Sequence, residues 1–488
     1  FPGKFGWGYD GVSMFAPTRL YGKPDDLRRF VNRAHELKLG VILDVVYNHF
    51  GNVDNYLPEF AGNFKSTKYQ NEWADAINFD GSDAQPVREF FEANTRYWIE
   101  EFHLDGYRYD ATHAIHDASS EHVMALIVRT ARKAAGKRQV LLVAENEVED
   151  VRMVRSPDKG GYGLDAAWND DFHHTTHVRL IGSNPAYYSD YMGSIEEMAA
   201  AIKHGFIYQG QRSQWQHKPR GTPTYGLPAT AFISFLQNHD QVSNSATGER
   251  IHLLTSPGKY RAMTAFWLLA PQTPMLFQGQ EFAASTPFLY FADFQGDMAN
   301  AVRKGRGEFL SQFPTLTTPA ARKHLADPCD SKTRERCRLD LAEREKHRPL
   351  YDLHIDLLKM RREDSVFKAQ RCDRLETANL SPDCLAVRYF GEKNDDRLVL
   401  INFGPDLQLV ALPQPLLAPP TEKQWKLVWS SNSDRYGGPG IAPVVSDDSW
   451  SIAGESTVVL QAVAAPKEIG QERADAEASE TSRGEEII

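Results

Sequence analysis

The sequence predicts an α/β protein, in which helices pack around a parallel sheet and a small antiparallel β domain follows. Two observations lead to this fold class. Short apolar runs alternate with amphipathic stretches over the first 290 residues, and short alternating runs separated by turn residues return after Cys384. Strand, helix and strand at such spacing are typical of parallel βαβ units. The length of 488 residues exceeds what one hydrophobic core usually organises, which agrees with two domains.

Seven short apolar or β-branched runs are expected to form strands. They are "GVSMFA" (11–16), "VILDVV" (41–46), "GYRYDA" (106–111), "VLLVAE" (140–145), "LDAAWND" (164–170), "FISFLQ" (232–237) and "PMLFQG" (274–279). A period of 3.6 residues predicts amphipathic helices between them, at 24–40, 86–103 and 121–135. A closed barrel needs eight strands, whereas an open doubly wound sheet could use seven. Periodicity alone therefore leaves both architectures open.

The pattern changes after residue 290. Charged residues dominate 298–348, where we expect irregular and helical surface structure, and 348–364 has the pattern of one more amphipathic helix. Five alternating runs then predict an antiparallel β domain: "CLAVRYF", "RLVLINF", "LQLVAL", "WKLVWSS" and "STVVLQAV". We expect an α/β domain over 1–365, a β-sandwich domain over 366–465 and a disordered acidic tail over 466–488.

Charge and composition indicate which kinds of molecule the protein is expected to bind. The formal net charge is −10, which argues against nucleic acid or an anionic membrane as the main partner. No apolar run is long enough to span a membrane, and no signal peptide opens the sequence. The four cysteines include no CxxC pair, so neither a disulfide framework nor a zinc site is expected. We therefore expect a cytoplasmic protein that acts on a neutral or metabolite-sized substrate.

Charged and polar side chains gather where the expected strands end. They are Asp44, Asn48 and His49 around the end of the second run, Arg108 and Asp110 in the third, Glu145 in the fourth, and His239 and Asp240 after the sixth. In a parallel barrel the C-terminal strand ends meet at one mouth, where active sites lie. Carboxylates from three strands in one pocket repel each other and resist desolvation, which separates their pKa values. This arrangement suits glycoside hydrolysis, because one carboxylic acid protonates the leaving oxygen while another carboxylate attacks.

Structural interpretations compete with this catalytic one. Arg108 lies two residues before Asp110 on the same strand face, so it is expected to keep Asp110 ionised. However, an aspartate at a strand end often caps a helix, and an Arg–Asp pair is often a structural ion pair. A metal site of Asp44, His49 and Asp110 has no supporting His or Cys spacing, and His113 alone is no ligand signal. We expect no metal and no cofactor, while spacing alone leaves the catalytic and structural interpretations open.

Four motifs in order resemble the sequence regions of a known superfamily. "DVVYNH" (44–49), "GYRYDATH" (106–113), "VAENE" (143–147) and "FLQNHD" (235–240) resemble those of the α-amylase superfamily of retaining glycosidases. Further stretches, including "GKFGWGYDGV" (3–12) and "WNDDFHH" (168–174), resemble its malto-oligosyltrehalose trehalohydrolase family. The resemblance implies a (β/α)8 TIM barrel and hydrolysis of the α-1,4-glucosidic bond next to the terminal trehalose of malto-oligosyl trehalose, which releases trehalose. It also implies a functional partner, the malto-oligosyltrehalose synthase that makes this substrate.

The resemblance implies a role for each polar residue at the strand ends. Asp110 matches the nucleophile, Glu145 the general acid/base and Asp240 the carboxylate that stabilises the transition state. The substrate-binding matches are Arg108, which orients the nucleophile, His49 and His239 at the cleavage position, Asp44 as a structural aspartate, and His113 on the leaving-group side. Candidates for sugar-stacking surfaces are Trp7, Tyr9, Tyr47, Trp168 and Phe172.

Two further expectations follow from the resemblance. Members of the family carry a β domain and a first barrel strand before the "FGWGYDG" loop, whereas this sequence begins directly in that loop. We therefore expect a catalytic barrel over 1–365 whose first strand is missing from this chain. The alternatives are an amylase, a debranching enzyme or an α-glucan transferase of the same superfamily, which share the four regions, or an inactive truncated chain that only binds glucan.

Overall fold

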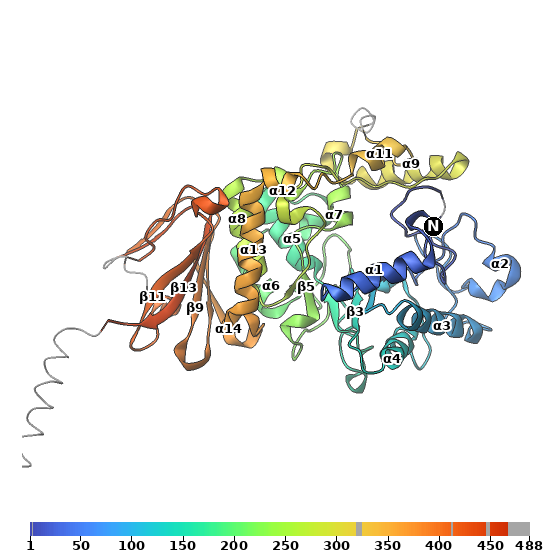
Figure 1. Ribbon diagram of the computed structural model, residues 1–488, viewed down its shortest axis with the longest axis horizontal. Helices are drawn as coiled ribbons and strands as arrows, with labels where there is room; N and C mark the ends of the chain where they lie inside the picture. Colours follow the sequence, from blue (N-terminus) through green and yellow to red (C-terminus); the bar gives the residue numbers. More distant parts are fainter. Residues whose placement is uncertain (2, 319–324, 411–412, 446–448, 467–488) are drawn as a thin grey trace, which may run out of the picture.

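The fold comprises a parallel sheet and an antiparallel β domain with helices between them (Figure 1). The computed structural model describes residues 1, 3–318, 325–410, 413–445 and 449–466. Helices α8 (Pro257–Leu269) and α13 (Arg348–Glu363) lie between a parallel sheet and an antiparallel sheet. The tail predicted over 466–488 lies outside the described residues from 467 onward.

The parallel sheet has its strands in chain order, β1-β2-β3-β4-β5-β6. They are β1 (Leu43–Val45), β2 (Gly106–Tyr109), β3 (Leu141–Ala144), β4 (Ala166–Trp168), β5 (Phe232–Ser234) and β6 (Thr273–Pro274). Five of the seven predicted strands are thus confirmed, and the one predicted at 274–279 overlaps β6 only at Pro274. Because all neighbours pair in parallel, their C-terminal ends lie along one rim. Within the described residues the parallel sheet has six strands, where a closed (β/α)8 barrel has eight.

The strand predicted at 11–16 is wrong, because this segment forms turns and irregular structure. The carbonyl oxygen of Met14 accepts hydrogen bonds from Asn94 Nδ2 (2.7 Å) and Trp98 Nε1 (3.0 Å), both on α3 (Gln85–Glu101). The Met14 carbonyl group is therefore hydrogen-bonded to helix side chains, whereas in a strand it would accept a hydrogen bond from a neighbouring strand. Apolar alternation shows that a segment is half-buried, but a strand also needs a partner strand.

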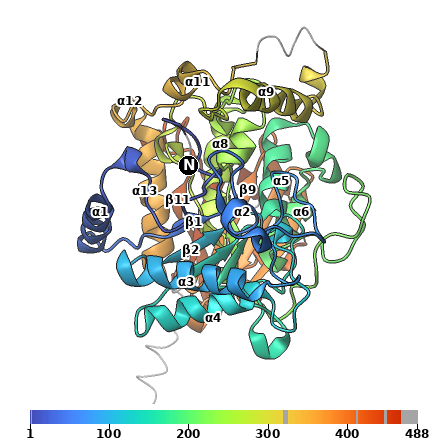
Figure 2. The same ribbon diagram turned by 90° about the vertical axis from the view of Figure 1, so that its right-hand side faces the viewer.

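Helices cover the outside of the parallel sheet (Figure 2). Besides α3, α8 and α13, the α-helices of the described residues are α1 (Pro24–Glu36), α2 (Leu57–Phe60), α4 (Val123–Ala135), α5 (Asp170–Ile181), α6 (Ile195–His204), α7 (His239–Ser243), α9 (Gly296–Leu310), α11 (Ser331–Arg336), α12 (Glu343–Lys346) and α14 (Ser365–Lys368). Helices α1, α3, α4 and α13 confirm the four predicted from periodicity. Phe91 and Ile99 of α3 are fully buried in the core that Tyr107 of β2 and Leu142 of β3 share. This packing holds the first strands of the sheet in place.

The antiparallel domain has a five-stranded sheet in the order β11-β13-β9-β8-β7 and a two-stranded sheet of β10 and β12. The strands are β7 (Leu375–Ser381), β8 (Cys384–Tyr389), β9 (Arg397–Asn402), β10 (Leu407–Val410), β11 (Lys423–Ser430), β12 (Ser449–Ile452) and β13 (Ser456–Ala464). Leu385 and Val387 of β8 belong to the core shared with α8 and α13, whereas Cys384 and Ala386 belong to the core on the opposite face. The five-stranded sheet is therefore covered on both faces. The five predicted strands are confirmed. Strand β7 was missed because its sequence is largely polar, and β12 was missed because it has only four residues.

No helix among the described residues is both long and apolar enough to cross a membrane. All four cysteines are free thiols, two of them buried.

Candidate active site

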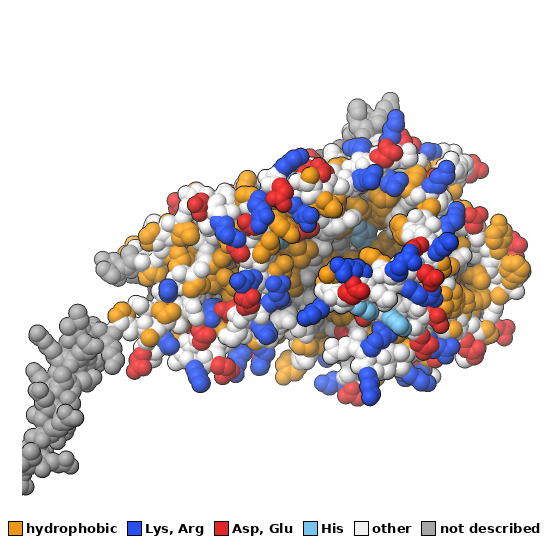
Figure 3. Space-filling model, viewed as in Figure 1, with side chains coloured by type: hydrophobic (Ala, Val, Ile, Leu, Met, Phe, Trp, Pro, Cys, Tyr) orange, Lys and Arg blue, Asp and Glu red, His pale blue; other side chains and the backbone are white. Residues whose placement is uncertain are grey.

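Side chains from neighbouring parallel strands meet at the C-terminal rim of the sheet. Asp44 on β1 is the register partner of Arg108 on β2. The ladder continues one residue past each strand, because the Asp110 amide donates to the last residue of β1 (3.0 Å) and the Glu145 amide donates to the last residue of β2 (3.0 Å). Asp110 and Glu145 thus stand side by side where the strands end. Figure 3 shows the surface hollowed between the N-terminal segment and α7, with histidine atoms visible in the hollow.

Arg108 lies at the centre of the site and is 3% exposed. Its Nη1 is 2.6 Å from Asp44 Oδ1 and 2.7 Å from Asp110 Oδ1, and its Nη2 is 2.6 Å from Glu145 Oε2. The Trp168 ring covers the guanidinium, with its centroid 4.5 Å from Cζ. One cation thus bridges three carboxylates from three strands. Because three negative charges exceed one positive charge in a poorly solvated site, the cluster favours retention of a proton.

Both oxygens of Asp110 are held. Asn48 Nδ2 donates to Asp110 Oδ2 (3.1 Å) and to its backbone oxygen (3.0 Å), while Oδ1 contacts Arg108. Burial and the nearby Glu145 carboxylate raise the pKa of Asp110, and Arg108 opposes them. Arg108 thus acts in the expected direction on this pKa, but burial and Glu145 outweigh it.

Glu145 is suited to hold a proton. Its Oε2 accepts a hydrogen bond from the Ala111 amide (2.9 Å), which is aimed by a left-handed backbone with φ of 40°. Burial raises the pKa of Glu145, Arg108 lowers it, and the nearby Asp240 carboxylate raises it. Burial likewise raises the pKa of Asp240 to about 6. The nearby Arg108 lowers this pKa, and the Asp110 carboxylate raises it. The three acids therefore have distinct environments within one pocket.

Tyr9 joins the N-terminal segment to this rim. Its hydroxyl donates to Asp44 Oδ2 (2.8 Å) and lies 3.1 Å from His239 Nε2. The Tyr9 and His239 rings stack with centroids 5.6 Å apart. His239 Nε2 is also 3.3 Å from Asp240 Oδ2, and burial lowers the pKa of His239 to about 4, with Arg108 acting in the same direction. His239 is therefore a neutral hydrogen-bonding group near pH 7.

A second edge of the site carries His49 and His113. The His49 ring stacks on Trp73, with centroids 5.9 Å apart, and its Nδ1 contacts Asn48 Oδ1. Burial lowers the pKa of both histidines, although Glu147, whose Oε2 lies 3.8 Å from His113 Nε2, opposes this for His113. Trp73 is 45% exposed, so its ring is available to a ligand. Sequence reasoning missed Trp73 because it lies in a loop without periodicity.

The predicted aromatic surfaces are only partly accessible. Tyr47 and Phe172 are fully buried, so their prediction as stacking surfaces is wrong. Trp168 is 7% exposed and covers Arg108, and Trp7 packs against other aromatic rings. Among the described residues, no group of three or more His, Cys, Asp or Glu side chains could hold a metal ion.

Comparisons with known proteins agree with this geometry. The chain is 42% identical over 307 residues to the malto-oligosyltrehalose trehalohydrolase of Saccharolobus solfataricus, 36% over 416 residues to that of Deinococcus radiodurans, and 32% over 469 residues to that of Mycobacterium tuberculosis H37Rv. The matches cover 63%, 84% and 95% of this chain, and 54%, 66% and 75% of the relatives. The chain thus spans between about half and three quarters of the length of these curated relatives. Residues 372–451 match a family model described as a domain of unknown function, DUF3459.

Two solved structures share the fold of this chain. A provisionally named α-amylase from Salmonella typhimurium superposes with a TM-score of 0.81 at 32% identity, over 95% of this chain and 74% of that one. Type I pullulanase from Bacillus subtilis shares the fold alone, with a TM-score of 0.61 at 18% identity over 94% of this chain and 60% of that one. With carboxylates from three strands gathered around Arg108 and 32% identity across three quarters of the mycobacterial relative, the chain belongs to the malto-oligosyltrehalose trehalohydrolase family.

Proposed function

We propose that the protein is a glycosidase that hydrolyses the α-1,4-glucosidic bond next to the terminal trehalose of malto-oligosyl trehalose and releases trehalose. The observation that carries this proposal is the single guanidinium of Arg108, which bridges the carboxylates of Asp110 and Glu145 at the rim. A shared cation keeps two carboxyl groups close, and a retaining glycosidase needs a separation of about 5–5.5 Å. The names of the curated relatives support the choice of substrate.

The mechanism is a double displacement with two carboxyl groups. Ionised Asp110 attacks the anomeric carbon while Glu145 protonates the leaving oxygen, so that trehalose departs and a glycosyl ester forms on Asp110. Glu145 then takes a proton from water, which attacks the ester and frees Asp110. Because Arg108 and the Ala111 amide occupy Glu145 Oε2, Oε1 is the oxygen that we expect to carry the proton.

The remaining predicted residues bind or orient groups in the same scheme. Arg108 holds Asp110 in place, and Asp44 in turn holds Arg108. Asp240 stabilises positive charge at the transition state. His49 and His239 bind the sugar at the cleavage position, and His113 lies on the leaving-group side. His239 is suited to donate or accept a hydrogen bond without adding charge beside the developing oxocarbenium ion.

The cellular setting follows from the same family. The substrate is expected to come from malto-oligosyltrehalose synthase, which acts earlier in the sequence of reactions. We place the protein in the cytoplasm, which the four free thiols support. We further propose 1–365 as the catalytic unit and 366–465 as an accessory β domain.

The test compares purified protein on maltopentaosyl trehalose and on maltoheptaose, following free trehalose and new reducing ends. We expect trehalose from the first substrate and little cleavage of the second. Asp110→Asn should abolish both signals, while Asp158→Asn, an exposed aspartate away from the rim, should retain them. Equal cleavage of both substrates would indicate an amylase-type enzyme. No product from protein with a cooperative thermal melt would overturn the proposal.

A further inference from the structure

The segment 206–221, between α6 and β5, folds back on itself beside the loop of the proposed general acid. Its two arms pair as an antiparallel bridge of Arg212 with Pro219. At its tip, Gln216 Nε2 donates to Glu147 Oε1 (2.9 Å), and Glu147 follows Glu145 by two residues. The tip thus touches the acid loop where that loop approaches His113.

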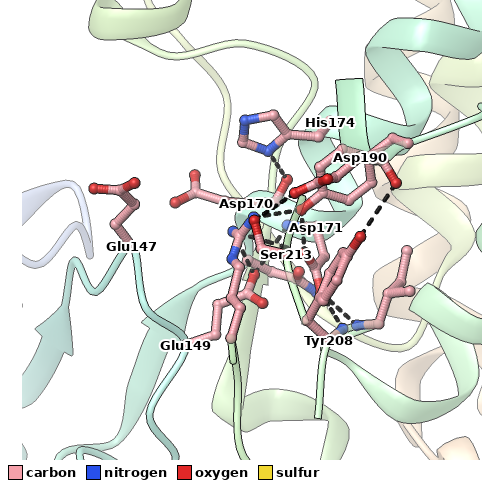
Figure 4. Close-up of polar contacts among 12 residues, drawn as sticks. Glu147, Glu149, Asp170, Asp171, His174, Asp190, Tyr208 and Ser213 are labelled. Atoms are coloured by element: carbon pink, nitrogen blue, oxygen red, sulfur yellow. Dashed lines mark hydrogen bonds and ion pairs between the residues drawn. The ribbon is translucent and has the colours of Figure 1, made fainter. Parts of the chain in front are cut away.

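Two aspartates from other elements hold this segment (Figure 4). Asp171 Oδ2 accepts hydrogen bonds from the amides of Ile207 (2.5 Å) and Tyr208 (2.7 Å). Asp190 accepts from the Ser213 hydroxyl (2.5 Å) and from the amides of the next two residues (2.8 and 3.2 Å). The backbone of 206–221 is therefore fixed near its start and near its tip.

Arg220 fixes the returning arm and lies at the centre of a buried charge cluster. Its Nη1 donates to the Tyr191 hydroxyl (2.5 Å), and its Nη2 is 3.3 Å from Glu149 Oε1 and 3.6 Å from Asp171 Oδ1. The side chain of Arg220 is 5% exposed and both carboxylates are fully buried. Removal of one member of such a cluster leaves an uncompensated buried charge. The cluster therefore resists displacement of the arm.

The same cluster reaches the acid loop. Glu149 lies on the stretch that carries Glu145 and Glu147, and the Gly221 amide donates to the backbone oxygen of Val148 (3.0 Å). Burial raises the pKa of Glu149, and Arg220 opposes this. One buried arginine thus joins the segment 206–221 to the loop that begins at the proposed general acid.

We propose that Arg220 is a positioning residue for leaving-group specificity: it holds the segment 206–221 so that Gln216 orients Glu147 beside His113. This inference rests on the proposed function. The general acid protonates the leaving oxygen, so polar groups that follow it on the same loop are placed to face the leaving sugar. Glu147 Oε2 and His113 Nε2 lie 3.8 Å apart, and both are polar groups suited to bind the hydroxyl groups of trehalose. A site built for hydroxyls discriminates strongly against leaving groups that lack them.

The experiment measures kcat and KM for maltopentaosyl trehalose and for 4-nitrophenyl α-maltopentaoside, which presents the same sugar chain with a leaving group that has no sugar hydroxyls. The variants are Gln216→Ala, Arg220→Gln and the double variant. Each single variant should lower kcat/KM for the trehalose substrate about tenfold, mainly through KM, and leave the nitrophenyl substrate within roughly threefold. Arg212→Ala, an exposed arginine on the same segment, is the matched control and should change neither.

The double variant shows whether Arg220 acts by positioning Gln216 or has a general structural role. If Arg220 acts through Gln216, the double variant should be no worse than the poorer single variant. Equal losses on both substrates, or losses that multiply in the double variant, would overturn the proposal. If Arg220→Gln fails to fold, the Gln216→Ala variant suffices as the test, and an unchanged KM for the trehalose substrate in that variant would overturn the proposal. A wild-type protein that cleaves the nitrophenyl substrate but releases no trehalose would instead contradict the proposed function.

Discussion

At the scale of single residues, Arg108 organises the site. An arginine can contact Asp44, Asp110 and Glu145 together because its guanidinium presents several donors in a planar fork. A lysine would offer one point charge and could not bridge the same oxygens. The pair Arg108 and Asp110 shares one strand face, so their proximity could be predicted from a period of two residues. The other two partners, Asp44 and Glu145, come from the neighbouring strand β1 and from the end of the neighbouring strand β3.

The pKa values of Asp110 and Glu145 predict a bell-shaped dependence of kcat/KM on pH. In the proposed mechanism Asp110 is ionised, so activity should rise as the pH increases through its pKa, which burial places above the ordinary value. Glu145 is protonated in that mechanism, so activity should fall as the pH increases through its pKa, which burial also raises. Glu145→Gln should lower kcat by about 10²–10⁴ and remove the falling limb at high pH. Assays of kcat/KM across pH would contradict the role of Glu145 if that limb stayed unchanged.

At the scale of elements, the rim depends on close pairing of β2 with β3. Gly106 begins β2 with φ of +142°, and a Cβ atom there would lie 1.8 Å from the Leu141 carbonyl oxygen. Only glycine fits this approach without moving the backbone. The position of Glu145 at the end of β3 therefore depends on a residue at the other end of the neighbouring strand.

Gly106→Ala should lower the free energy of unfolding by roughly 2–4 kcal/mol, because the new Cβ must push β3 away. Urea denaturation monitored by circular dichroism would measure the change. The matched control is Gly305→Ala in α9, where nothing lies within 4 Å and the helix should gain up to about 1 kcal/mol. Equal effects at both positions would show that steric crowding at Gly106 is not the cause.

At the scale of the whole molecule, α8 and α13 join the two sheets. Their apolar faces share one core with Leu385, Val399 and Val459 of the antiparallel sheet. Arg361 at the end of α13 is 8% exposed, and its guanidinium donates to the backbone oxygen of Leu268 in the last turn of α8 (3.0 Å) and to those of Ala270 and Gln272 just after α8. The end of α8 and the start of β6 are thus bound by a residue from far along the chain.

Arg361→Met should lower the free energy of unfolding by about 3–5 kcal/mol, because several buried carbonyl oxygens lose their donors at once. Thermal unfolding would show a lower Tm than that of the wild type. Arg362→Met, at the exposed neighbouring position, is the control and should change stability by less than about 0.5 kcal/mol. A Tm equal to the wild type in Arg361→Met would contradict a structural role for these bonds.

Local pattern accounts for most elements but not for all. Helix α3 and strands such as β8 were predicted because periodicity and β-branched residues signal burial directly. The error at 11–16 arose because alternation does not reveal whether a partner strand is present. Strand β7 was missed because its polar residues give no alternation, although pairing with β8 makes it a strand.

The sequence by itself determined the fold class, the parallel strands and the residues at their C-terminal ends, because each depends on short-range pattern and on motifs within a few residues. Tertiary structure alone decided how those ends combine. Tyr9 and Trp73 reach the rim from loops, and Arg220 meets Glu149 and Asp171 across long stretches of chain. The burial of the acids at the rim, which raises their pKa values, likewise depends on packing of the whole domain, because side chains from several strands and loops together exclude water from them.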